Sequence, residues 1–203
     1  MKIILASKNQ DKIKEIKKIL DGTGVLLKTC NDIEIPEVEE TGSTFVENAI
    51  LKARSASMIT GLASIADDSG ICVDALNGMP GILSARFSGG LTDDKRNNKK
   101  LLELLKDEKN RKAHYYCALV FIRSPKDPQP IIAEGIWQGE ILLGPQGKNG
   151  FGYDPIFLDY KTDLSAAELN SDHEVGILIP FESRTFLLAQ NQSILWIFTG
   201  AAQ

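Results

Sequence analysis

The sequence predicts an α/β fold, because short apolar segments typical of strands alternate with segments that have the apolar spacing of amphipathic helices. The first pair sets the pattern: residues 2–6 are apolar and β-prone, and the next apolar residues then fall on one face of a helix, namely Ile13, Ile16, Ile19 and Leu20. A chain of 203 residues with 43% hydrophobic content can bury the core of one large domain or of two small lobes. Since no repeat or linker is visible, we expect residues 1–203 to form one domain.

The remaining elements follow in order along the chain. Ser43 or Thr44 is expected to cap a helix, with Glu47 as the second partner of a capping box. Another helix is predicted over residues 93–106. Its expected apolar stripe consists of Leu101, Leu102, Leu104 and Leu105. Further strands are predicted at residues 25–29, 62–66, 115–122 and 130–137, the last two as a hairpin.

Composition excludes several classes of function. A net charge of −4 gives no general basic field for duplex nucleic acid. Three widely spaced cysteines and two histidines do not form a zinc motif, and they fit reduced thiols better than disulfides. No segment is apolar over the ~20 residues that span a bilayer, and the apolar start is too short for a signal peptide. We therefore expect a cytoplasmic protein that binds neither nucleic acid nor membranes.

The polar segment from Ser7 to Lys12 lies between the first strand and the first helix. Backbone N–H groups at a helix N-terminus attract anions, and the lysines and polar side chains here would add charge and donors for a phosphate tail. The segment lacks the glycines of a P-loop. A capped helix with solvated lysines is the alternative interpretation.

Two acidic segments could together hold a cation. Residues 37–49 carry several glutamates ahead of a helix, and Asp67 and Asp68 close a buried strand that we expect to end in a tight turn at Ser69-Gly70. Since side chains alternate along a strand, the two aspartates should point to opposite sides. One carboxylate from each segment could bind Mg²⁺, which takes one or two carboxylates and substrate phosphates. Ordinary solvated acidic loops are the alternative.

A glycine-rich segment with aromatic residues lies at residues 144–157. Glycines let the backbone approach a flat ligand, Phe151 or Tyr153 could stack on a base, and Asp154 could accept hydrogen bonds from ring N–H groups. A packed turn is the alternative.

Taken together, these motifs resemble the inosine triphosphate pyrophosphatases, which hydrolyse dITP, ITP and XTP to the monophosphate and pyrophosphate. The resemblance runs from Met1 to about Leu169. It rests on Ser7-x-Asn9-x-x-Lys12-x-x-Glu15, Glu40-Thr41-Gly42-x-Thr44-Phe45-x-Glu47-Asn48-Ala49, Ala66-Asp67-Asp68-Ser69-Gly70, Pro80-Gly81-x-x-Ser84-Ala85-Arg86, Asn97-Asn98-x-x-Leu101-Leu102, Cys117-Ala118-Leu119 and Gly150-Phe151-Gly152-Tyr153-Asp154-Pro155.

The resemblance implies an elongated, two-lobed α/β fold around a mixed twisted sheet, a nucleotide cleft between the lobes, and a homodimer. It implies that Glu40 and Asp68 bind Mg²⁺ and that Asp68 activates the attacking water. The implied substrate-binding residues are Ser7, Lys8, Asn9, Gln10, Asp11, Lys12, Ser69, Phe151, Gly152, Tyr153 and Asp154. A related hydrolase of modified pyrimidine nucleotides is a second possibility within this fold, and residues 66–70 and 151–154 argue against it.

Residues 174–203 depart from the family's pattern. The family has a lysine and a Ser-His-Arg triplet there, whereas the corresponding positions are Glu174 and Leu178-Ile179-Pro180. A shifted reading frame after about His173 would explain the change, and the nucleotide sequence would test this hypothesis. The missing basic contacts predict low activity, and a nucleotide-binding or weakly active paralogue is the alternative.

Overall fold

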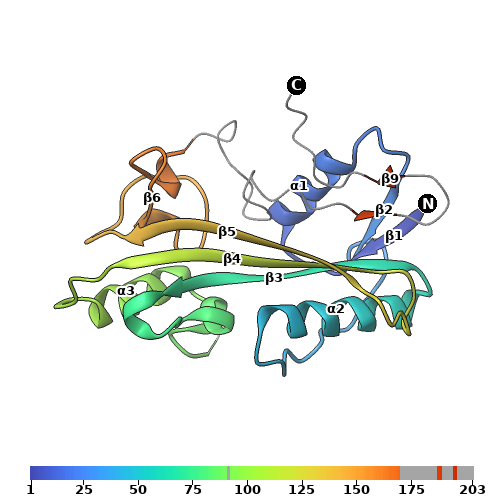
Figure 1. Cartoon of the computed structure of the whole chain (residues 1–203), viewed down its shortest axis with the longest axis horizontal. Coiled ribbons are helices and arrows are strands. Elements are labelled where there is room, and N and C mark those ends of the chain that lie inside the picture. Colours follow the sequence, from blue (N-terminus) through green and yellow to red (C-terminus); the bar gives the residue numbers. More distant parts are fainter. Residues whose placement is uncertain (91, 170–186, 189–193, 196–203) are drawn as a thin grey trace. The chain divides into compact units, whose positions relative to one another are not determined.

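The computed structural model describes residues 1–90 and 92–169, together with residues 187–188 and 194–195. Helices and strands alternate in its first half, and long strands dominate the middle (Figure 1). The principal elements are β1 (Lys2–Leu5), α1 (Gln10–Leu20), β2 (Leu26–Thr29), α2 (Phe45–Thr60), β3 (Ala63–Val73), α3 (Asp94–Leu104), β4 (Lys112–Ile122), β5 (Ile131–Ile141), β6 (Phe157–Asp159) and β7 (Leu164–Ser165). Within residues 174–203 the structure describes the antiparallel pair β8 (Leu187–Leu188) and β9 (Ile194–Leu195). The substituted positions Glu174 and Leu178-Ile179-Pro180, and the frame-shift hypothesis that concerns them, lie outside the described residues.

Seven strands form one mixed sheet in the order β2-β1-β3-β4-β5-β6-β7. β1 pairs in parallel with both β2 and β3, whereas β6 is antiparallel to β5 and β7. The α/β class with a mixed sheet is therefore confirmed. The described chain divides into two compact units, the first with residues 1–68 and 118–134 and the second with residues 69–117 and 135–169.

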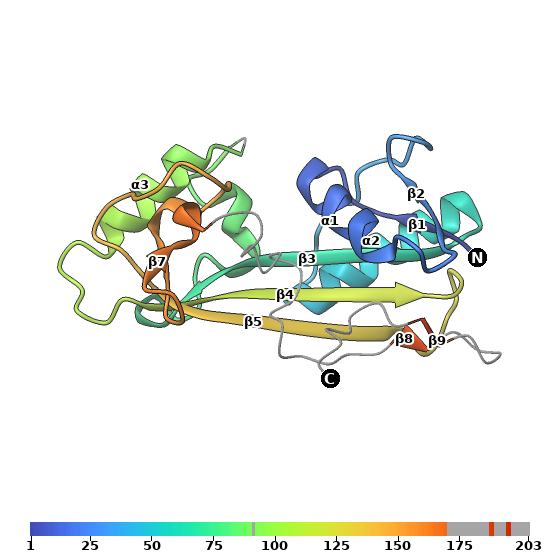
Figure 2. The same ribbon diagram turned by 90° about the horizontal axis from the view of Figure 1, so that it is seen from above.

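In the first unit, α1 and α2 cover opposite faces of the sheet near β1 and β3 (Figures 1 and 2). The side chains of β1 between them, Ile3, Ile4 and Leu5, are fully buried. α1 contributes Ile13, Ile16 and Leu20 to the core, as its spacing predicts, and α2 contributes Ala49, Ala53 and Ala56. The described helices are all too short or too polar to cross a membrane.

The tight turn expected at Ser69-Gly70 is wrong, because β3 continues without interruption through these residues to Val73. Gly70 serves a different purpose in the second unit. A Cβ at this position would lie 2.4 Å from Ser84 Oγ and 2.5 Å from the Gly81 carbonyl oxygen. Gly70 therefore permits a close approach of two backbone segments rather than a turn.

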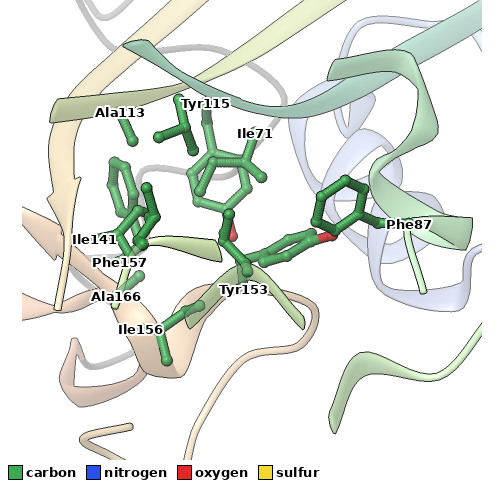
Figure 3. Packing of buried hydrophobic residues seen from close by; sticks show 12 residues of the cluster. Ile71, Phe87, Ala113, Tyr115, Ile141, Tyr153, Ile156, Phe157 and Ala166 are labelled. Carbon is green, nitrogen blue, oxygen red and sulfur yellow. The ribbon is translucent and has the colours of Figure 1, made fainter. Parts of the chain in front are cut away.

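The core of the second unit is built around three aromatic rings. Phe157 meets Tyr115 and Trp137 edge to face at centroid distances of 4.8 and 5.1 Å, and Tyr115 and Trp137 stack at 5.8 Å. Figure 3 shows Tyr115, Phe157 and Tyr153 among the aliphatic residues of this cluster. α3 packs here through Leu101, and Leu105, which directly follows the helix as its C-cap, is fully buried as well.

The apolar stripe expected for α3 is wrong at Leu104, because this residue is 50% exposed. Leu101 and Leu105 are four residues apart and share one face of the helix, whereas Leu104 lies to the side of it. The run of four leucines is therefore wider than the surface that the helix buries.

Candidate functional site

Asp67 and Asp68 contact different helices, as strand alternation predicts. Asp67 pairs with Lys12 of α1 and is almost completely buried. Asp68 instead contacts α2. Its Oδ1 lies 3.0 Å from Lys52 Nζ, and its Oδ2 accepts a hydrogen bond from Asn48 Nδ2 at 3.2 Å. The opposite orientation of the two carboxylates is confirmed, and only Asp68 meets the second acidic segment.

Glu40 and Asp68 converge on one ammonium group. Lys52 Nζ lies 2.8 Å from Glu40 Oε1 and 3.0 Å from Asp68 Oδ1, and all three side chains are about four-fifths buried or more. The two acidic segments, separated by nearly thirty residues of chain, therefore meet at a point that attracts positive charge.

Asn48 connects the segment that carries Glu40 to Asp68. Its side chain is fully buried, with Oδ1 accepting from the Gly42 N–H at 2.8 Å while Nδ2 donates to Asp68. A Cβ on Gly42 would lie 2.7 Å from Asn48 Oδ1 and from Glu47 Cβ. The glycine is therefore required for this bridge to form.

The start of α2 fixes the position of this bridge. Thr44 is the N-cap and forms the predicted capping box: its hydroxyl accepts from the Glu47 N–H, and Glu47 Oε2 accepts from the Thr44 N–H at 3.0 Å. Glu47 also accepts from the Ser43 N–H at 2.7 Å. These bonds satisfy helix-terminal donors and hold the preceding loop against the helix.

The charges of this cluster shift each other's pKa values. Burial alone would lower the pKa of Lys52, but the carboxylates of Asp68, Asp67 and Glu40 outweigh it and raise the pKa above its ordinary value. Burial raises the pKa of Asp68, and the ion pair with Lys52 opposes that rise. Burial outweighs the ion pair, so the pKa of Asp68 stays above its ordinary value even with a positive group beside it.

Residues 7–12 have the geometry of a capped helix N-terminus. Ser7 Oγ accepts from the Asn9 N–H and Asn9 Oδ1 accepts from the Lys12 N–H, both at 3.3 Å. Lys8 is exposed and lies 3.8 Å from Glu37, while Gln10 Nε2 donates to the Lys8 carbonyl. The side chain of Asp11 lies outside what the structure describes. Phosphate binding by this segment stays a prediction.

Phe151, Gly152, Tyr153 and Asp154 lie in the second unit and differ in exposure. The Phe151 side chain is 36% exposed, whereas Tyr153 and Asp154 are buried. Tyr153 Oη donates to the Ser84 carbonyl at 2.8 Å, and burial raises its pKa. Of the two rings considered for base stacking, Phe151 is therefore the accessible one. Ser69 lies half-buried in β3, directly after Asp68.

Asp154 holds its own loop together. Its Oδ2 accepts from the Phe151 N–H at 2.9 Å, and its Oδ1 accepts from Tyr115 Oη at 2.8 Å. Burial and the adjacent carboxylate raise the pKa of Tyr115 well above its ordinary value. Both carboxylate oxygens accept hydrogen bonds within the protein, so Asp154 braces this loop, and its interaction with ring N–H groups of a base stays a prediction.

Lys52 and Asn48 are the site residues that sequence reasoning missed. Lys52 lies next to Ala53 and three residues after Ala49 in α2, both of which are fully buried, and a charge among such small apolar residues is the signal that could have found it. Asn48 lies within one of the motifs that carry the family resemblance. Its role depends on the hydrogen bond to Asp68 of β3, and the sequence around Asn48 gives no signal for a contact with a distant strand.

In the part of the chain that the structure describes, no group of three or more His, Cys, Asp or Glu side chains is arranged to hold a metal ion. Glu40 and Asp68 offer two carboxylates. Two are enough for Mg²⁺ when substrate phosphates and water complete its octahedral shell, and the ammonium of Lys52 marks where a cation is stabilised between them. The residues present therefore fit a magnesium ion.

Comparisons with known proteins agree on one family. The sequence model of the Ham1 family matches residues 3–177. A dITP/XTP pyrophosphatase of Nitrosomonas europaea is 47% identical over 173 residues, which cover 85% of each chain. One from Thioalkalivibrio sulfidiphilus is 50% identical over 172 residues, covering 84% of this chain and 88% of that protein. The solved structure of a HAM1 protein from Coxiella burnetii superposes with a TM-score of 0.82 at 43% identity, over 85% of this chain and 88% of that one.

Proposed function

This chain belongs to the Ham1 family, and from that premise we propose that it hydrolyses the deaminated purine nucleoside triphosphates dITP, ITP and XTP to the monophosphate and pyrophosphate. The observation that carries the proposal is the convergence of Glu40 and Asp68 on Lys52. Curated relatives named dITP/XTP pyrophosphatase support the substrate class.

The proposal includes dependence on Mg²⁺, which Glu40 and Asp68 would hold together with the substrate phosphates. When bound, the ion would neutralise phosphate charge and increase the acidity of a bound water. Lys52 would then lie beside the same phosphates and add a second positive charge.

In this proposal Asp68 accepts the proton of the attacking water. Lys52 opposes the rise in the pKa of Asp68 that burial causes, and the hydrogen bond from Asn48 to Oδ2 fixes the orientation of the carboxylate. Lys12, which is held by Asp67 at the start of α1, would contact the triphosphate from the other face of β3, with Ser7 to Asp11 supplying further polar contacts.

Base choice would depend on the 6-oxo group that hypoxanthine and xanthine share. A pocket that donates hydrogen bonds to this oxygen leaves its donors unpaired with adenine, so ATP would be a poor substrate. Phe151 would stack on the base through its exposed ring. GTP must be excluded at its 2-amino group, since guanine also carries the 6-oxo group.

Three further features complete the proposal. We expect a homodimer, which light scattering would measure, and a cytoplasmic location, where nucleotide pools need cleansing.

We also expect slow turnover, because Glu174 and Leu178-Ile179-Pro180 replace basic contacts of the family pattern. Charge-assisted hydrogen bonds contribute about 1.5–3 kcal/mol each, so their loss would reduce activity strongly.

A pyrophosphate-release assay with ITP, dITP, XTP, ATP and GTP, with and without Mg²⁺, tests the proposal. Release from the first three, dependent on Mg²⁺ and above that from ATP and GTP, is expected. Equal release from ATP, or release that does not change when Mg²⁺ is chelated, would contradict it. Binding of ITP without any release would point to a nucleotide-binding protein.

A further inference from the structure

Both polar atoms of the Gly152 backbone are held by one face of α3. The Gly152 N–H donates to Asp94 Oδ2 at 2.9 Å, and the Gly152 carbonyl accepts from Asn98 Nδ2 at 3.0 Å. Asp94 and Asn98 are four residues apart and therefore neighbours on the helix surface. We call these two residues and their bonds to Gly152 the α3 clamp.

The loop on both sides of Gly152 is also fixed. The Phe151 N–H donates to Asp154, which in turn accepts from the buried Tyr115 hydroxyl. Gly150 adopts φ +71°, and a Cβ there would lie 2.2 Å from Asp154 Oδ2. The α3 clamp adds two hydrogen bonds from an α-helix to these contacts.

The α3 clamp holds the residue next to the exposed ring. Gly152 has φ +60° and nothing within 4 Å of a Cβ position, so packing does not restrict its backbone. Two hydrogen bonds from the helix therefore restrict the rotation of the peptide groups around Gly152, and with it the direction of the Phe151 side chain. A loop fixed before binding loses less entropy when the ligand arrives.

We propose that Asp94 and Asn98 are positioning residues that orient Phe151 toward the nucleobase and so determine how tightly the base is held. This inference rests on the proposed function, since it takes the ligand to be a purine nucleotide. The inference concerns the binding of the base and not the hydrolytic step, because Glu40 and Asp68, the carboxylates assigned to hydrolysis, do not belong to α3 or to the loop around Gly152.

The expected signature is a higher KM with little change in kcat. An interaction made equally in the ground state and the transition state affects KM alone. Each neutral hydrogen bond contributes about 0.5–1.5 kcal/mol, so Asn98→Ala should raise KM for ITP by about two- to tenfold. Asp94→Ala should have a smaller effect, because Asp94 is exposed to solvent. Asp94→Asn keeps an acceptor oxygen and should restore most of the parent KM.

Asp93→Ala is the matched control. Asp93 caps α3 by accepting from the Arg96 N–H at 3.0 Å, and the hydrogen bonds of Gly152 to α3 described above come from Asp94 and Asn98 instead. This variant should lower the melting temperature, as loss of a helix cap does, while leaving KM unchanged. It therefore separates a weaker helix from a released loop.

The experiment measures kcat and KM for ITP, together with the Kd of ITP by calorimetry, for the parent and the four variants. Unchanged KM and Kd in Asn98→Ala, or an equal rise in Asp93→Ala, would overturn the clamp. If the parent binds ITP but releases no pyrophosphate, the proposed function fails and the Kd values still decide the clamp. If the parent binds no ITP, both proposals fail.

Discussion

Asp67 and Asp68 are consecutive in β3, and each forms an ion pair with a lysine from a different helix. Asp67 faces Lys12 of α1, and Asp68 faces Lys52 of α2. Because side chains alternate along a strand, one dipeptide supplies an anchor to each helix. The two carboxylates should therefore differ in function, and matched amide substitutions can separate them.

Asp68→Asn should lower kcat for ITP by about 10²- to 10⁴-fold, the usual contribution of a general base. The amide has nearly the volume of the carboxyl group, so the fold should persist. Steady-state pyrophosphate release measures kcat, and a circular dichroism spectrum shows whether the fold persists. Activity near that of the parent would remove Asp68 from the chemistry.

Asp67→Asn is the companion variant. It leaves Glu40 and Asp68 intact but weakens the hold on Lys12, so the main expected change is a higher KM for ITP. A kcat loss as large as that of Asp68→Asn would contradict the assignment of separate functions. A change in neither constant would show that Lys12 needs no carboxylate partner.

Asn48→Ala should reduce both stability and Mg²⁺ affinity. The change leaves the Gly42 N–H and Asp68 Oδ2 without a partner that the structure shows, and an unsatisfied buried group costs about 1–3 kcal/mol. Calorimetric titration with Mg²⁺ and urea unfolding measure the two effects. A loss of stability without any loss of Mg²⁺ affinity would limit Asn48 to a structural role.

Gly42→Ala tests the close contact behind that bridge. The added Cβ would lie 2.7 Å from Asn48 Oδ1, so the loop or the amide must move, at a cost of about 1–3 kcal/mol. Gly144→Ala is the control, because nothing lies within 4 Å of its Cβ position and its φ is ordinary. Urea unfolding of both variants should show a loss in the first and almost none in the second.

The sequence predicts the elements of this fold well where the signal is local. The apolar spacing of α1 and the capping box at Thr44 and Glu47 depend on residues within one or two helical turns, and both are confirmed. Gly70 shows the opposite case. Its neighbours favour a turn, but the reason for glycine is the approach of Ser84 and Gly81, and such a contact leaves no local pattern.

The acidic residues of the candidate site can be predicted from the sequence, whereas the side chains that contact them are harder to predict. Glu40 and Asp68 stand in recognisable motifs, but their convergence depends on Lys52 and Asn48 of α2. Tyr153 was a candidate for base stacking because an aromatic ring in a glycine-rich loop suggests an exposed platform. Its hydroxyl instead donates to the Ser84 carbonyl within the core, and such burial has no signal in the local sequence.

Tyr115 should make the stability of the protein sensitive to high pH. Its folded-state pKa is raised, first by burial and then by Asp154, so the folded protein keeps a proton that the unfolded chain loses. The stabilisation is fully present below the unfolded pKa of about 10 and decreases as the pH rises above it. Tyr115→Phe lacks this hydrogen bond and this titration. The free energy of unfolding of this variant should be lower than that of the parent at pH 7 and should fall less steeply above pH 10. Urea unfolding at several pH values measures it, and an equal decrease with pH in the parent and the variant would contradict the assignment.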